Sequence, residues 1–320
     1  MEINPVVTAE RLTCRYGRTE AVRDLTFAVE PGRVFALLGP NGAGKTTTIR
    51  TLMNILRPSG GRATVLGIDS RRLGATEFAT IGYVSENQQL PAWMTVDQLL
   101  AYCRPFYPTW DEALCARLIG DFDLPRGTKI GRLSRGMRVK AALVSSLAYR
   151  PRLLVLDEPF TGLDPVVRDD LVHGVLELAG QEQWTVFVSS HDLDEVERLV
   201  DTVAFIDAGR LVLCEPFDRL HARFRRIEVS LNGDVPLTAS AETVDSSRPW
   251  IGVQRAGRVV RFIETAYVSG ESERRAQAAW PAARVEALPM TLREIFVALV
   301  RQQRMMKLAD DRHGRPKTEN

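Results

Sequence analysis

The segment Gly39–Thr46, which reads GPNGAGKT, combines small residues with one lysine and one threonine. Glycines let the backbone curl so that several N–H groups face one anion, and a helix that follows adds the positive end of its dipole. Lys45 supplies a cation for the β- and γ-phosphates of a nucleotide, and the Thr46 hydroxyl is a hard oxygen ligand suited to Mg²⁺. The segment therefore predicts a phosphate-binding loop. Its predicted contacts to the nucleotide come from Gly39, Pro40, Asn41, Gly42, Ala43, Gly44, Lys45, Thr46 and Thr47.

Two acidic residues, Asp157 and Glu158, follow the apolar run Leu153–Leu156. A carboxylate at the end of a buried strand reaches the edge of the sheet that carries the phosphate loop, where Asp157 can hold a metal ion directly or through water. Glu158 can orient or deprotonate a water molecule that attacks the γ-phosphate. Adjacent acids also serve as a helix N-cap and a solvated charge, but the phosphate loop upstream favours the catalytic interpretation.

The apolar pattern indicates the elements that must position these residues. Val34–Leu38 is a continuous apolar run, as expected of a strand buried on both faces, and helical spacing follows the loop from about residue 44 to 56. Apolar strands and helices then alternate to about residue 220, with helical spacing dominant between 95 and 123. This alternation predicts an α/β fold with a mostly parallel sheet and helices on both faces.

The pattern changes after His221. Amphipathic strands are predicted at residues 227–231, 253–254 and 259–263, and a closing helix at 291–306. Residues 1–220 carry a net charge of −3, whereas residues 221–320 carry +5, which supports a separate module. The expected organisation is a nucleotide-binding domain at 1–220 with a helical part at about 90–150, a C-terminal α+β accessory domain at 221–308, and a polar tail at 309–320.

Composition limits the class of protein. The 320 residues include 42 Lys plus Arg and 40 Asp plus Glu, so the net charge of +2 argues against a bulk nucleic-acid binder. The chain has neither a signal-peptide pattern at its start nor the roughly 20 consecutive apolar residues that cross a bilayer. Its four cysteines lie far apart, without metal or redox spacing. We expect a chain in a reducing cytosol.

The residues between and after the two phosphate motifs narrow the choice. Leu133–Met137, about twenty residues before Asp157, resembles the signature sequence LSGGQ of the ATP-binding subunits of ABC transporters. Gly162–Asp164 resembles the loop that follows the catalytic acid in that family, and His191 matches its switch histidine. The resemblance covers about residues 4–220, and the order and spacing of the motifs make it specific.

The resemblance implies roles for further residues. Ser134, Arg135 and Gly136 would form a second anion site, which in the family closes over the γ-phosphate held by the opposite subunit. Ser134 can at the same time be a helix N-cap. Asp164 would tie its loop across the dimer interface, and His191 would reach the γ-phosphate and the attacking water. Tyr16 stands where the family stacks an aromatic ring on adenine, and the alternative to this role is a surface or half-buried tyrosine.

Two motifs depart from the family pattern, at three positions. The family usually has Gln at the end of the strand around Tyr83, where it contacts the metal and senses the membrane partner. Here Glu86 most closely occupies that position, with Gln88 as an alternative. In the signature, Arg135 and Met137 replace Gly and Gln, which resembles a bacterial exporter branch. An arginine close to a γ-phosphate is electrostatically favourable.

The resemblance implies the cassette fold of P-loop NTPases, with a mostly parallel core, an antiparallel β subdomain and a helical subdomain. It implies an ATPase that uses ATP and Mg²⁺ and drives a separately encoded membrane permease for export. The cassette would act with a second copy or a homologous cassette, at the cytoplasmic face of the membrane, without nucleic acid. Two alternatives remain: a soluble ABC ATPase that acts on DNA or ribosomes, and a regulatory module that holds ATP but hydrolyses it poorly.

Overall fold

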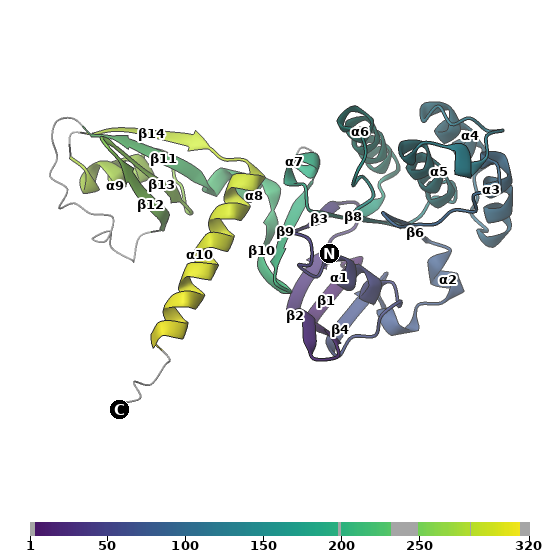
Figure 1. Ribbon diagram of the computed structural model, residues 1–320, viewed down its shortest axis with the longest axis horizontal. Helices are drawn as coiled ribbons and strands as arrows, with labels where there is room; N and C mark the ends of the chain where they lie inside the picture. Colours follow the sequence, from purple (N-terminus) through teal and green to yellow (C-terminus); the bar gives the residue numbers. More distant parts are fainter. Residues whose placement is uncertain (1–3, 198–199, 232–248, 282, 314–320) are drawn as a thin grey trace. The chain divides into compact units, whose positions relative to one another are not determined.

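The computed structural model describes residues 4–197, 200–231, 249–281 and 283–313. The chain divides into two compact units, Met1–Cys214 and Glu215–Asn320 (Figure 1). The division falls six residues before the boundary at 220/221 that the sequence suggested. Glu215, the first residue of the second unit, forms an ion pair with Arg223.

A six-stranded sheet forms the centre of the first unit, in the order β10-β9-β3-β8-β7-β6. Strands β6, β7, β8, β3 and β9 run parallel, as the continuous apolar runs predicted. Every residue of β7 and β8 is buried. The strands are β3 (Val34–Leu38), β6 (Ile81–Ser85), β7 (Leu153–Asp157), β8 (Thr185–Ser190), β9 (Thr202–Asp207) and β10 (Arg210–Pro216).

A second, four-stranded sheet in the order β2-β1-β4-β5 lies in the same unit. It consists of antiparallel pairs of β1 (Val7–Tyr16), β2 (Thr19–Val29), β4 (Gly60–Val65) and β5 (Ile68–Asp69). The two sheets share one core, in which the rings of Phe27, Phe35 and Phe187 lie 5.2–6.0 Å apart. The sequence pattern did not predict β4 and β5, because β4 begins with two glycines and β5 is two residues long.

Helices complete the first unit. The helix α1 (Lys45–Leu52) contacts β7 of the central sheet and β2 and β4 of the second sheet. Where one long helical stretch was expected between 95 and 123, Pro105 separates α3 (Val96–Cys103) from α4 (Glu112–Asp121). The remaining helices are the four-residue α2 (Ala75–Phe78), α5 (Arg135–Leu147), α6 (Pro165–Glu182) and the four-residue α7 (Leu193–Val196).

The second unit contains an antiparallel sheet in the order β12-β13-β11-β14. The rings of Trp250 and Trp280 stack in its core, and the ring of Phe262 packs against both at a tilt. The strands are β11 (Arg225–Ser230), β12 (Trp250–Ala256), β13 (Val259–Glu264) and β14 (Arg284–Pro289). The helices are α8 (Phe217–Arg223), α9 (Glu271–Ala279) and α10 (Leu292–His313).

Three features of this unit differ from the sequence-based expectation. The helix α9 was not predicted, since its nine residues are mostly polar and only Ser272 and Ala276 are buried. The strand β14 was not predicted either, because it has no fully buried residue. The closing helix α10 extends to His313, so residues 309–313 of the predicted tail are helical. The rest of that tail, 314–320, lies outside the described residues.

Candidate nucleotide-binding site

The segment Gly39–Thr46 joins β3 to α1, and close packing explains two of its glycines. A Cβ atom on Gly39 would lie 2.1 Å from the carbonyl oxygen of Ile206. Gly44, the N-cap of α1, has a φ of 108°, and a Cβ there would lie 2.5 Å from the carbonyl oxygen of Ala21. No other residue fits either position, so the backbone can approach a ligand with its N–H groups at the start of α1.

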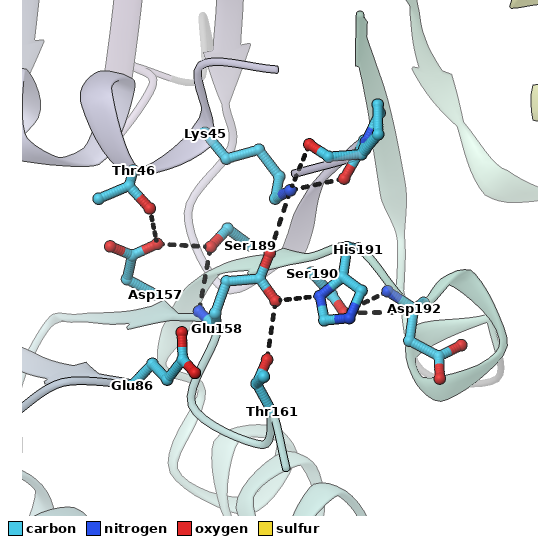
Figure 2. Close-up of polar contacts among 12 residues, drawn as sticks. Lys45, Thr46, Glu86, Asp157, Glu158, Thr161, Ser189, Ser190, His191 and Asp192 are labelled. Carbon is cyan, nitrogen blue, oxygen red and sulfur yellow. Dashed lines mark hydrogen bonds and ion pairs between the residues drawn. The ribbon is translucent and has the colours of Figure 1, made fainter. Parts of the chain in front are cut away.

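Lys45 is the first residue of α1, and its side chain is almost fully buried, with 4% exposed. Its ammonium Nζ donates to the carbonyl oxygens of Gly39 at 2.5 Å and Pro40 at 3.0 Å. Nζ also forms an ion pair with Oε1 of Glu158 at 3.0 Å (Figure 2). The loop thus holds its own cation between backbone carbonyls and a carboxylate, where a phosphate can compete for it.

Strand register brings the first carboxylate of the site into place. In the parallel sheet, Asp157 at the end of β7 pairs with Ser85 of β6 on one side and Ser189 of β8 on the other. Its Oδ1 atom accepts hydrogen bonds from Ser189 Oγ at 2.8 Å and Thr46 Oγ1 at 3.0 Å. Burial raises the pKa of Asp157 above its ordinary value, and these two hydroxyl donors counteract part of that rise.

The second carboxylate, Glu158, is held from several sides. Its φ of 51° is left-handed, a strained conformation for this residue, and its N–H donates to Ser189 Oγ at 3.1 Å. Its Oε2 atom accepts from Thr161 Oγ1 at 3.0 Å and lies 2.7 Å from Nδ1 of His191 (Figure 2). Burial would raise the pKa of Glu158, but His191 and Lys45 outweigh it and hold that pKa below its ordinary value.

Lys45, Glu158 and His191 face one cavity of about 330 Å³, and the predicted metal ligand Asp157 lies behind its lining, next to Thr46. The cavity is lined by Ala21, Asn41, Gly42, Gly44, Lys45, Thr46, Thr47, Glu86, Glu158, Thr161 and His191. Glu86, one of the two candidates for the position after β6, therefore lies in this cavity. The other candidate, Gln88, instead accepts a hydrogen bond from the Ser85 N–H at 3.4 Å.

The remaining predicted site residues lie outside this cavity in the single chain. Tyr16, at the end of β1, is 47% exposed. Ser134 is the N-cap of α5 and accepts a hydrogen bond from the Met137 N–H at 3.2 Å. Asp164 caps α6 and accepts a hydrogen bond from the Val166 N–H at 3.0 Å.

The other predicted site residues outside the cavity make different contacts. Gly136 is buried against α6, and Arg135 forms an ion pair with Glu86. Ala43 is buried behind the loop, where its carbonyl accepts from Gly209 N–H.

Sequence reasoning missed two residues that organise the site. Ser189 is fully buried and bonds to both acidic residues, and Thr161 bonds to Glu158. A serine directly after the apolar run 186–188 is a weak signal that could have pointed to Ser189. No feature of the sequence singles out Thr161, because its contact depends on how the loop after Glu158 folds.

The oxygen atoms of this site suit a small hard cation. The Thr46 hydroxyl and the Asp157 carboxylate lie 3.0 Å apart, and the Glu86 carboxylate lines the same cavity. Within the described residues, no group of three or more His, Cys, Asp or Glu side chains is arranged to hold a metal ion. Because Mg²⁺ is usually bound by one or two protein ligands together with substrate phosphates, the donors present fit a cation that arrives with a nucleotide.

Fold and site together define a class of protein. A phosphate loop between a buried parallel strand and a helix, with two acidic residues at the end of a nearby strand, is the arrangement of a P-loop nucleotide hydrolase.

Comparison with known proteins identifies the family within that class. Residues 22–161 match the ABC transporter family. The chain is 35% identical over 235 residues to the fluoroquinolones export ATP-binding protein of Mycobacterium tuberculosis, covering 72% of this chain and 77% of that protein. It is 32% identical over 226 residues to the bacitracin transport ATP-binding protein of Bacillus licheniformis, covering 70% and 74%. A solved ATP-binding subunit of an ABC transporter, 27% identical, superposes with a TM-score of 0.61 over 68% of this chain and 92% of that chain.

The chain therefore belongs to the ATP-binding proteins of ABC transporters, and it is an ATPase subunit of a membrane-associated transport system. In the portion of the chain that the structure describes, none of the helices combines the length and apolar character needed to span a bilayer.

Proposed function

We propose that this ATPase takes Mg²⁺ with ATP, forms a dimer that encloses two nucleotides, and drives export through a separately encoded membrane permease from the cytoplasmic face. One observation carries the proposal. Lys45, Thr46, Glu158 and His191 line one cavity, while Ser134 at the start of α5 lies outside it. The resemblance of the signature implies a second anion site at the start of α5, so another chain would complete each nucleotide site.

The residues of the phosphate loop bind and orient the nucleotide. Lys45 would exchange its carbonyl and carboxylate partners for the β- and γ-phosphate oxygens. The loop N–H groups would add further hydrogen bonds at the start of α1. Phosphoryl transfer depends mainly on positioning and charge neutralisation, and a buried cation acts strongly in such a site. Tyr16, exposed at the end of β1, would stack on the adenine.

Three residues would hold the metal, which would neutralise charge on the phosphate oxygens when bound. The Thr46 hydroxyl, already beside Asp157, would be a direct ligand. Asp157 would hold the metal directly or through water, and Glu86 would contribute from the loop after β6. Metal binding would also compensate for the burial that raises the pKa of Asp157.

Glu158 has the properties of the general base. Because its pKa is held below the ordinary value, its carboxylate is ionised at neutral pH and can accept a proton from a water molecule. Thr161 and His191 fix its Oε2 atom in one orientation. Once phosphate binds Lys45, Glu158 loses that counter-charge, so its affinity for a proton rises when a substrate is present.

The direction of transport rests on the relatives. One of them is named for export of fluoroquinolones and one for transport of bacitracin. Both share the cassette with this chain, and the signature with arginine and methionine resembles the exporter branch. Substrate contacts lie in the permease in such systems, so the cassette supports export without identifying the molecule transported.

Sedimentation of the purified Glu158→Gln variant tests the central claim. This variant should stay monomeric with ADP and Mg²⁺ and become dimeric with ATP and Mg²⁺, because the trapped nucleotide joins two chains. A monomer under both conditions would contradict the dimer. Affinity capture of the wild-type chain from detergent-treated membranes should recover a multi-spanning membrane protein; recovery of ribosomes alone would support the soluble ABC ATPase instead.

A further inference from the structure

Two of the three positions that depart from the family pattern contact each other in the structure. Glu86 stands where Gln is usual, after β6, and Arg135 stands where Gly is usual in the signature. Arg135 Nη2 donates to Glu86 Oε1 at 3.2 Å, although 49 residues separate them in sequence. An acidic and a basic replacement at positions that meet within one chain form a matched pair.

Arg135 also reaches the loop that follows the proposed base. A Cβ atom on Gly162 would lie only 3.0 Å from Arg135 Nη1, so the guanidinium rests against this glycine. Glu86 is anchored on its other side, since its N–H donates to the Asp157 carbonyl at 2.9 Å. The guanidinium therefore connects the start of α5 with the loops after β6 and β7, which both border the nucleotide cavity.

The ion pair between Arg135 and Glu86 can open and close, so that each side chain can take another partner. Its side chains are 45% and 33% exposed for Arg135 and Glu86. Ion pairs with this much solvent contact stabilise a protein only weakly, so a phosphate or a metal ion can displace them. A single carboxylate cannot fully neutralise Arg135 and serve a metal in the adjacent cavity at the same time.

We propose that Glu86 restrains Arg135 within its own chain until nucleotide binds, and that Arg135 then turns to the phosphates of a nucleotide held by a second copy. The proposal rests on the proposed nucleotide-bound dimer. Glu86 is a positioning residue in this step, because it acts on dimer closure through Arg135. The exchange makes closure conditional on a loaded cavity, since only a loaded cavity gives Glu86 another partner.

The test measures ATP-driven dimerisation in the Glu158→Gln background by sedimentation, as the ATP concentration at half-maximal dimer. Adding Glu86→Gln should lower this concentration about two- to fivefold, because Arg135 is released while an oxygen donor remains. Adding Arg135→Gln should raise it about tenfold, because a cation for the opposite phosphates is lost. Affinity of the monomer for a fluorescent ATP analogue, measured at low protein concentration, separates nucleotide binding from dimer closure.

The combined change decides the proposal. With Arg135→Gln present, Glu86→Gln should have no further effect, because its target is gone. An unchanged effect of Glu86→Gln in that background, or no effect of Glu86→Gln alone, overturns the proposal. Arg132→Gln removes an exposed charge close to the signature and should change the ATP concentration at half-maximal dimer by less than twofold. A tenfold change in this variant would show that any positive charge in this region has the same effect, and it would contradict the proposal. If the parent forms no dimer with ATP, the proposed function itself fails.

Discussion

Each unit of the molecule buries acidic residues, and their surroundings differ. In the second unit, Glu264 is fully buried and accepts from Trp250 Nε1 at 2.8 Å and from Ala266 N–H at 3.3 Å, and Arg275 lies 3.6 Å away. These partners come from the core around Glu264 and from residues that follow it in the same chain. In the first unit, Asp157 and Glu158 also accept several hydrogen bonds, but Glu158 lines a cavity beside the buried Lys45.

The difference shows how a catalytic carboxylate is recognised. Burial and hydrogen bonding occur in both units, so neither one by itself indicates chemistry. What distinguishes the first unit is a cavity lined by a lysine, three threonines and a histidine, whose partners can be exchanged for those of a ligand. Changes in the first unit should therefore affect reaction and binding, whereas changes at Glu264 should affect stability.

The largest effect is expected for Glu158→Gln, which removes the proposed proton acceptor while keeping its size. ATP hydrolysis should fall about 100-fold or more, the range for loss of a general base, while ATP still binds. Phosphate release under saturating ATP measures hydrolysis, and an equilibrium binding experiment measures the affinity for ATP. The control Glu177→Gln changes an exposed residue of α6 and should hydrolyse ATP normally. Unchanged turnover in Glu158→Gln would remove Glu158 from the mechanism.

Lys45→Ala should act on binding. Loss of charge-assisted hydrogen bonds to two phosphates should weaken ATP affinity about 100-fold. Isothermal titration with ATP and Mg²⁺ gives this affinity directly. Lys140→Ala, on α5 and outside the cavity, should bind ATP like the wild type. Retained micromolar affinity in Lys45→Ala would contradict the phosphate assignment.

Glu264→Gln should weaken the second unit without touching the reaction. Replacing a buried charged acceptor that serves Trp250 and Arg275 should cost about 2 kcal/mol of unfolding free energy. Chemical denaturation followed by tryptophan fluorescence measures this loss. Glu286→Gln breaks an exposed ion pair with Arg284 and should cost at most about 0.5 kcal/mol. A larger loss of ATP affinity than of stability in Glu264→Gln would show that the comparison between the units is wrong.

Asp157→Asn should give the smallest effect and one of opposite sign. Burial raises the pKa of Asp157, so its ionised form opposes folding at neutral pH, and this cost disappears as pH falls through the raised pKa. Without nucleotide, Asp157→Asn should thus be more stable than wild type by about 1 kcal/mol at pH 7, with the advantage shrinking toward pH 4. Denaturation curves across that range test the sign. A destabilised variant at pH 7 would mean that its hydrogen bonds outweigh its burial.

Residue types and spacing were enough to predict the loop at Gly39–Thr46, the acids Asp157 and Glu158, and the parallel core. The parallel core was predicted correctly because its pattern is local, whereas the roles of the loop and of the two acids stay predictions. A strand buried on both faces must be apolar along its length, and a backbone that curls around a phosphate needs glycine at particular positions. The elements that were missed, β4, β5, α9 and β14, are short or polar and owe their structure to the neighbours they pair with or pack against.

Only the tertiary structure decided which distant side chains meet. Ser189 joins Asp157 because β7 and β8 align these two residues in register, and a shift of one position would turn the hydroxyl to the other face of the sheet. Glu86 and Arg135 looked like two separate departures in the sequence, yet folding places them 3.2 Å apart. Residue identity determines what chemistry a side chain offers, whereas contacts across the fold determine which partner receives it.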